Sequence, residues 1–189
     1  MELIILGCGS SLGSPWINNY WGNCDKKNKL NKRTRCSAFI KKGNLSVLID
    51  SSPDIKEQFI KNKINDVDCV LYTHEHSDQT SGIFELRPFF WKHKKKINIY
   101  GYKNTINHIK KRHDYLFKKI GIYNPIVKSN IIKSKFSLGK FKERVFFNSI
   151  QISHGNIDTT AYIFEKTAYI SDANDLSIIK MDQFKNLKY

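Results

Sequence analysis

Residues 69–79 read Cys69-Val70-Leu71-Tyr72-Thr73-His74-Glu75-His76-Ser77-Asp78-Gln79, an apolar run followed directly by a polar string. The apolar run predicts a buried strand over about 68–73, so the polar string falls on the turn that leaves this strand. Two imidazoles at positions i and i+2 and a carboxylate at i+4 can converge from such a turn on one divalent cation. The alternative is a polar loop in which Ser77 or Asp78 caps the next helix. The pattern favours the metal hypothesis.

Two further candidate ligands also follow strand-like runs, namely His154 in the segment Ile152-Ser153-His154-Gly155 and Asp172 in the segment Tyr169-Ile170-Ser171-Asp172. The ends of packed strands project side chains onto one rim, where ligands far apart in the sequence can meet. Taken alone, His154 is better interpreted as an ordinary, partly buried histidine and Asp172 as a turn or capping residue. Zinc accepts imidazole nitrogen and carboxylate oxygen, and the sequence therefore offers this candidate ligand set: His74, His76, Asp78, His154 and Asp172.

The length and composition predict one globular domain over residues 1–189, since 40% of the residues are hydrophobic. The N-terminal stretch has no basic region and only four consecutive apolar residues, so we expect no signal sequence or membrane span and a soluble, cytoplasmic protein. The four cysteines form no C-x-x-C pair, which favours reduced thiols. A structural zinc held by Cys8, Cys24 and Cys36 is a less favoured alternative.

The chain is strongly basic, with 32 Lys and Arg against 17 Asp and Glu and a formal net charge of +15. This charge favours polyanionic partners such as RNA or phosphorylated metabolites. Most of it, however, is lysine scattered among asparagine and isoleucine, which compositional drift would also produce. Charge alone therefore does not indicate a dedicated nucleic-acid-binding protein.

Strands and helices alternate in the first part of the chain, and strands dominate after Pro125. We expect strands over 3–6, 36–41, 45–50, 68–73, 97–100, 145–153, 160–165 and 168–171. We expect helices starting near Ser52-Pro53 and covering about 77–91 and 105–120. This order predicts an α/β (α+β) fold in which two sheets pack face to face under outer helices.

The segment 74–79 resembles the H-x-H-x-D-H signature of the metallo-β-lactamase superfamily. His74, His76 and Asp78 match this signature, and Gln79 stands in place of its final histidine. The segment 48–54, which contains Asp50, looks like the aspartate-bearing strand end that precedes the signature. His154 and Asp172 fall where the third histidine and the metal-bridging aspartate belong. Further segments are similar to a bacterial branch related to the phosphoribosyl cyclic phosphodiesterase of the carbon-phosphorus lyase pathway: residues 7–15, 22–25, 31–37, 82–83 and 86–89.

The resemblance implies an αββα sandwich, a divalent zinc or manganese ion, and hydrolysis of a small phosphate ester by a metal-activated water. Asp78 would orient or deprotonate that water, and Asp172 would bridge or complete the coordination. Asp50 would hold a ligand histidine in one tautomer, or alternatively accept only local backbone hydrogen bonds. Arg87, Arg35 and Arg33 are candidates for binding the substrate phosphate, although each is also expected as a surface or packing residue. The histidines at 93, 108 and 113 lie among lysines and are expected to be solvated.

Two departures from the family pattern bear on activity. The family's second metal takes the final histidine of the signature and one more histidine near the C-terminus, but here Gln79 replaces the first and no histidine follows His154. Glutamine is a weaker ligand for zinc, so one ion is favoured over two. The chain also ends at Tyr189, before the last strands and helix of such proteins, and we therefore expect a truncated domain with an unpaired sheet edge that a homodimer could cover.

Two other functions stay open from the sequence. The first is a catalytically impaired or inactive remnant of such an enzyme, which Gln79 and the missing histidine support. The second is an RNA-processing nuclease similar to ribonuclease Z, which the basic charge supports, although no insertion suited to gripping tRNA separates the motifs. A small phosphate-containing substrate is favoured over RNA as the partner, and no membrane is expected.

Overall fold

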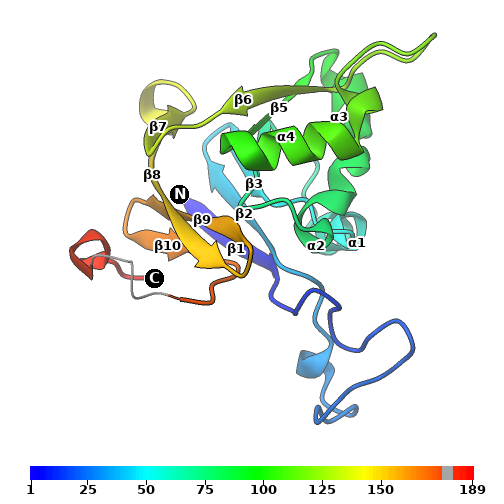
Figure 1. Cartoon of the computed structure of the whole chain (residues 1–189), viewed down its shortest axis with the longest axis vertical. Helices are drawn as coiled ribbons and strands as arrows, with labels where there is room; N and C mark the ends of the chain where they lie inside the picture. Colours follow the sequence, from blue (N-terminus) through cyan, green and yellow to red (C-terminus); the bar gives the residue numbers. More distant parts are fainter. Residues whose placement is uncertain (176–180) are drawn as a thin grey trace.

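Two β-sheets pack against each other in the computed structural model, which describes residues 1–175 and 181–189 (Figure 1). The first sheet has six strands in the order β1-β2-β3-β4-β5-β6. Its first three strands are antiparallel, and β3 to β6 are parallel. The strand bounds are β1 Glu2–Gly7, β2 Ser37–Lys42, β3 Leu45–Ile49, β4 Cys69–Leu71, β5 Ile97–Gly101 and β6 Val127–Ile131.

The second sheet is antiparallel and has the order β10-β9-β8-β7. Its strands are β7 Lys135–Leu138, β8 Val145–His154, β9 Ile157–Phe164 and β10 Thr167–Tyr169. The last residues of the chain run along β10, where the Ala168 backbone N–H donates to the Tyr189 carbonyl over 2.9 Å. The edge at β10 therefore has a partial backbone partner within this chain.

Helices lie on the outer face of the six-stranded sheet (Figure 1). The α-helices are α1 Ile55–Lys61, α2 Ser77–Thr80, α3 Arg87–His93 and α4 Lys103–Arg112. The 3-10 helices are η1 Lys29–Asn31, η2 Ser81–Leu86, η3 Asp114–Leu116, η4 Phe141–Glu143 and η5 Met181–Phe184. Across the described part of the chain, no helix has the length and apolar character needed to cross a membrane.

The single helix expected over 77–91 is wrong, because this segment forms α2, η2 and α3 in succession. Gly82 lowers the helix propensity in its middle, and Pro88 lacks the N–H that would continue a helix. Pro88 instead stands in the first turn of α3, where that N–H has no partner within the helix.

The central strands β2, β3 and β4 of the six-stranded sheet are buried on both faces, which explains their nearly continuous apolar runs. Phe39 and Leu48 face the helices, whereas Ile40, Val47 and Ile49 face the second sheet. Neighbouring residues of a strand point to opposite faces, so each run contributes to two cores. The outer face of the second sheet carries a small cluster around Ile152 and Ala161, against which Phe184 of η5 packs. The predicted fold class of two packed sheets with helices outside is therefore confirmed.

Gly82 fixes the approach of η2 to the loop that follows β3, and Gly82→Ala is expected to lower the free energy of unfolding by about 2–3 kcal/mol. Its backbone N–H donates to the Ser51 carbonyl over 2.8 Å, and an added Cβ would lie 2.1 Å from the Ser52 carbonyl oxygen. Urea denaturation of the two proteins would measure the loss. Gly101→Ala is the control, because its Cβ would meet ordinary contacts of 3.4 to 3.5 Å. Equal losses for both variants would contradict the prediction.

Candidate metal centre

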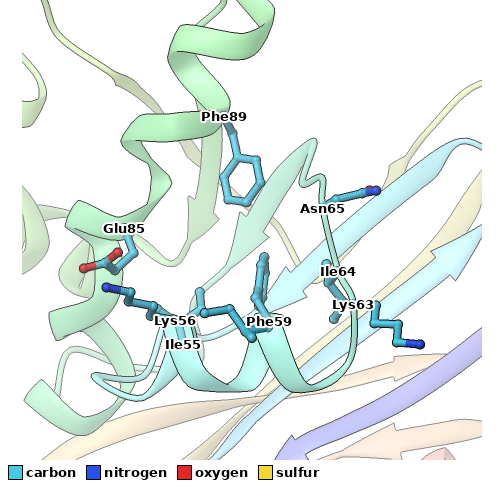
Figure 2. Close-up of a pocket in the computed structure, with 9 residues that line it drawn as sticks. Ile55, Lys56, Phe59, Lys63, Ile64, Asn65, Glu85 and Phe89 are labelled. Carbon is cyan, nitrogen blue, oxygen red and sulfur yellow. The ribbon is translucent and has the colours of Figure 1, made fainter.

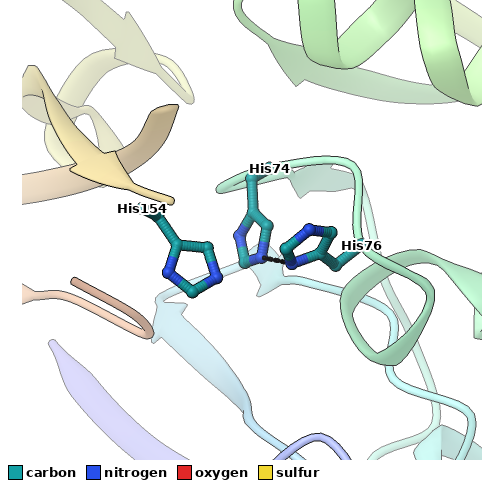
Figure 3. A group of neighbouring side chains, drawn as sticks. All are labelled: His74, His76 and His154. Carbon is teal, nitrogen blue, oxygen red and sulfur yellow. Dashed lines mark hydrogen bonds between the residues drawn. The ribbon is translucent and has the colours of Figure 1, made fainter. Parts of the chain in front are cut away.

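Three imidazole rings meet where the two sheets face each other (Figure 3). His74 and His76 lie on the turn between β4 and α2, and His154 ends β8. One ring nitrogen from each residue belongs to a group in which all such atoms lie within 4.8 Å of one another. The structure thus brings together three of the residues that the sequence proposed as ligands, although His154 lies eighty positions after His74.

The spacing of these nitrogens suits one divalent ion. His74 Nε2 and His76 Nδ1 are 3.0 Å apart. Two nitrogens bound to one tetrahedral zinc ion at about 2.0–2.1 Å would lie about 3.3–3.4 Å from each other. Within residues 1–175 and 181–189, these histidines are the only group of three or more potential ligands that comes this close. Their role as ligands stays a prediction, and the donor set fits it.

His74 is the most buried of the three and is held in the form that a metal requires. Burial lowers the pKa of His74 to about 4, although the negative charge of Asp172 opposes this effect. The ring is therefore neutral at pH 7, and a neutral imidazole can donate its nitrogen lone pair to a cation. The ring needs no further deprotonation to bind an ion.

Asp50 reaches His74 through Thr73 rather than directly. The fully buried Asp50 carboxylate accepts hydrogen bonds from the Thr73 backbone N–H and from the Thr73 hydroxyl, each over 2.8 Å. The same hydroxyl oxygen lies 3.0 Å from His74 Nδ1. Because Nδ1 has this partner, Nε2 is left to face His76, which is the usual arrangement around a metal-binding histidine. Asp50 therefore accepts a backbone hydrogen bond and is linked to His74 through the Thr73 hydroxyl, and its role in holding the His74 tautomer stays a prediction.

The two candidate carboxylates meet at Gln79. Gln79 Nε2 donates to Asp78 Oδ2 and to Asp172 Oδ2, each over 3.2 Å. Gln79 Oε1 is buried, and the described part of the chain offers it no hydrogen-bond partner. Neither aspartate belongs to the compact group of imidazole nitrogens. The structure therefore brings Asp78 and Asp172 together, but around an amide group.

Glu75 is a residue that the sequence interpretation missed. Its buried carboxylate lies 2.7 Å from His108 Nδ1 and accepts from the Thr105 hydroxyl over 3.2 Å, while Arg112 donates to its backbone carbonyl. These three partners lie on one face of α4, so this helix holds the backbone between His74 and His76. In the sequence, the only sign of these contacts was that residues 105, 108 and 112 are spaced three and four positions apart, so that they share one face of a helix.

Of the three histidines expected to be solvated, His93 and His108 are exposed and His113 is half-buried. His108 is exposed but bonded to Glu75, and His93 Nε2 lies 2.6 Å from Asp66 Oδ1. His113 is half-buried at the end of α4, where burial lowers its pKa. His108 therefore contacts the backbone segment between His74 and His76 through Glu75, whereas His93 pairs with Asp66 away from the imidazole cluster.

Each candidate phosphate-binding arginine has a partner within the chain. The Arg35 guanidinium is ion-paired with Asp54, and its Nε donates over 2.8 Å. Arg33 Nη1 donates to Cys8 Sγ over 2.7 Å. The Arg87 guanidinium lies over the rings of Phe84 and Trp91, 4.2 and 4.8 Å from their centroids. Substrate contact by these arginines stays a prediction.

The Arg35–Asp54 pair predicts a pH-dependent loss of stability. Hydrogen bonding to Arg35 lowers the pKa of Asp54, so the pair stabilises the fold above the unfolded-state pKa of about 4 and ceases to do so as the pH falls through the lower folded-state value. Asp54→Asn should lower the free energy of unfolding by about 1.5–3 kcal/mol at pH 7. Denaturation at pH 7 and near pH 2.5 would measure this, and a loss of equal size at both pH values would contradict it.

The cysteines do not support the alternative of a structural zinc. Cys8 and Cys24 are exposed, Cys36 is half-buried, and all are free thiols. Burial raises the pKa of Cys36 to about 12, so its thiol is protonated at pH 7. In the ranges that the structure describes, they form no group of three close ligands.

A pocket of about 440 Å³ lies between α1 and the η2–α3 segment (Figure 2). The rings of Phe59 and Phe89 face each other there, with centroids 5.9 Å apart. The pocket shares no lining residue with the imidazole cluster. The candidate metal centre is therefore identified from its side chains and not from this pocket.

Comparison with known proteins points to one family. A family described as "Beta-lactamase superfamily domain" matches residues 46–187. The chain is similar to a solved diphosphatase of the PhnP family, with 25% identity, a TM-score of 0.78, and coverage of 98% of this chain and 70% of that one. The fold is shared with the short form of human tRNase Z, at 14% identity and a TM-score of 0.58, over 89% of this chain and 67% of that one.

A curated relative from Porphyromonas gingivalis, named octanoyltransferase, is 29% identical over the whole of this chain. The chain spans only 38% of the length of that relative. The name therefore describes a much longer protein and assigns no activity to the matched part.

Proposed function

Because the chain belongs to the metallo-β-lactamase superfamily, we propose that it is a metal-dependent hydrolase that cleaves a small phosphate ester. The observation that carries the proposal is the meeting of His74, His76 and His154, which come from segments of two different sheets. Converging imidazoles at strand ends have no evident structural purpose, because packing alone would be served better by apolar side chains.

The proposed ligands are these three imidazoles, with zinc or manganese as the ion. A bound divalent ion lowers the pKa of its water and polarises a phosphoryl oxygen. Asp78 lies two residues after His76 and is proposed to orient the attacking water or to accept its proton. Asp172 is proposed to complete the site beside Asp78, and Asp50 to fix the His74 tautomer through Thr73.

A phosphodiester or similar small phosphate ester is the proposed substrate class. The net charge of +15 favours an anionic substrate, and the diphosphatase similar to this chain is named for a phosphate-cleaving activity. RNA is a less favoured partner, since the likeness to tRNase Z extends to the fold alone. Steep salt dependence of RNA binding would favour the nuclease instead. The proposed setting is the cytoplasm, and a homodimer is proposed only as a way to cover exposed sheet edges.

Turnover of bis-p-nitrophenyl phosphate tests the proposal. The metal-stripped protein should be inactive, and addition of zinc or manganese should restore turnover that chelation removes again. Turnover that stays at background with an excess of either ion would instead support the alternative that the protein is an inactive remnant of such an enzyme. In that case the protein retains the fold but does not catalyse the reaction.

A further inference from the structure

We infer that the amide of Gln79 takes the place of a second metal ion, so that the centre holds a single ion at the three imidazoles. This inference rests on the proposed function, because it concerns the same site. In the family pattern that the chain resembles, the residue at position 79 would be a histidine ligand of that second ion. Here the amide bonds to the two aspartates on which such an ion would depend.

The Gln79 side chain is held in place by its surroundings. The residue is 1% exposed, its backbone N–H donates to the His76 carbonyl over 3.1 Å, and its carbonyl accepts from the Ser51 N–H over 2.8 Å. Its backbone is therefore tied both to the imidazole turn and to the loop after β3. The side chain extends from this anchored position towards Asp78 and Asp172.

The chemistry of the contacts fixes which end of the amide faces the aspartates. An ionised carboxylate only accepts hydrogen bonds, and an amide nitrogen has two N–H groups to donate. One N–H is available for each aspartate, so the nitrogen end is fully used. Two carboxylates drawn together would repel each other, and a pair of donors between them offsets this repulsion as a cation would.

The amide cannot perform this task and also act as a ligand. To offer Oε1 to an ion between the aspartates, the group would have to turn over and lose both hydrogen bonds. Oε1 now points into a buried place where the described residues give it no partner. An amide oxygen is also a weaker zinc ligand than an imidazole. A contact between Oε1 and an ion would therefore compensate poorly for the two lost hydrogen bonds. The aspartates are thus held together without a second ion.

Metal stoichiometry of the full chain, measured with manganese by elemental analysis and electron paramagnetic resonance, tests the inference. The unaltered protein should bind about one equivalent and give the spectrum of isolated manganese. Gln79→His offers a second ion one imidazole beside Asp78 and Asp172, and three protein ligands suffice for an ion even without the histidine that the family pattern places near the C-terminus. This variant should therefore bind a second equivalent, with at least about tenfold tighter uptake of that ion than the unaltered protein, and should give a spectrum of coupled ions. Asn124→His adds an imidazole at an exposed loop position and should still bind one equivalent.

The outcomes separate this inference from the proposed function. Two tightly bound ions in the unaltered protein, or equal uptake by Gln79→His and Asn124→His, would overturn the role of Gln79 while leaving the three-imidazole centre intact. Absence of any bound ion in the unaltered protein would overturn the centre itself, and the inference with it.

Discussion

His76→Ala is expected to reduce the metal content from about one equivalent per chain to background. The variant removes one of three converging nitrogens and leaves His74 and His154 as an incomplete pair. Removal of a group that only hydrogen-bonds to a metal ligand already lowers the affinity for the metal by about 10–100-fold. Removal of a ligand itself should therefore lower this affinity further. Elemental analysis after dialysis against a defined zinc concentration would measure the change.

His93→Ala is the matched control for this experiment. His93 is an imidazole on α3 that contacts Asp66 and takes no part in the cluster. Its variant should keep the ion, and zinc should raise its melting temperature as it does for the unaltered protein, because a ligand that binds only the folded state stabilises it. Unchanged metal content in His76→Ala would refute the assignment of the centre.

The strand ends that carry the imidazoles could be predicted from the sequence because burial leaves a strong local pattern. The run before His74 is apolar on both faces of a strand, as expected for a parallel strand covered on each side, and β4 occupies it. His154 was found through the same logic, since it ends the long strand β8. Alternation of helix and strand signals then sufficed for the fold class.

Strands β6 and β7 were missed because their sequences carry little apolar signal. β6 reads Val127-Lys128-Ser129-Asn130-Ile131 and has only one buried residue, as is common for a strand at a sheet edge. Its strand conformation comes from parallel pairing with β5 rather than from its own composition. Pairing of this kind depends on contacts between distant segments, which a local pattern does not reveal.

Parts of the site also depended on such distant contacts. The aspartate at position 50 was predicted as a partner of a ligand histidine, but the intervening hydroxyl of Thr73 became visible only once β3 and β4 lay side by side. The hydrogen bond from Gln79 to Asp172 joins positions more than ninety residues apart. Sequence spacing could propose these residues, whereas their hydrogen-bond partners required the fold.

Asp78→Asn is expected to lower turnover of bis-p-nitrophenyl phosphate by about 10²–10⁴-fold, which corresponds to about 3–5 kcal/mol of activation free energy. Asparagine matches the shape of aspartate, and its Oδ1 can still accept the hydrogen bond that Gln79 Nε2 donates to Asp78. It cannot, however, take a proton from an attacking water. The change therefore removes the proposed proton acceptor while preserving the surrounding contacts.

The metal content distinguishes this role of Asp78 from a role as ligand. If the three imidazoles hold the ion, Asp78→Asn should keep about one equivalent while its turnover falls, and kcat should carry most of the loss. Glu57→Gln, a matched change of an exposed carboxylate on α1, should leave both quantities unaltered. Turnover within a few-fold of the unaltered protein would exclude Asp78 as the proton acceptor, whereas loss of the ion together with activity would place its carboxylate among the ligands.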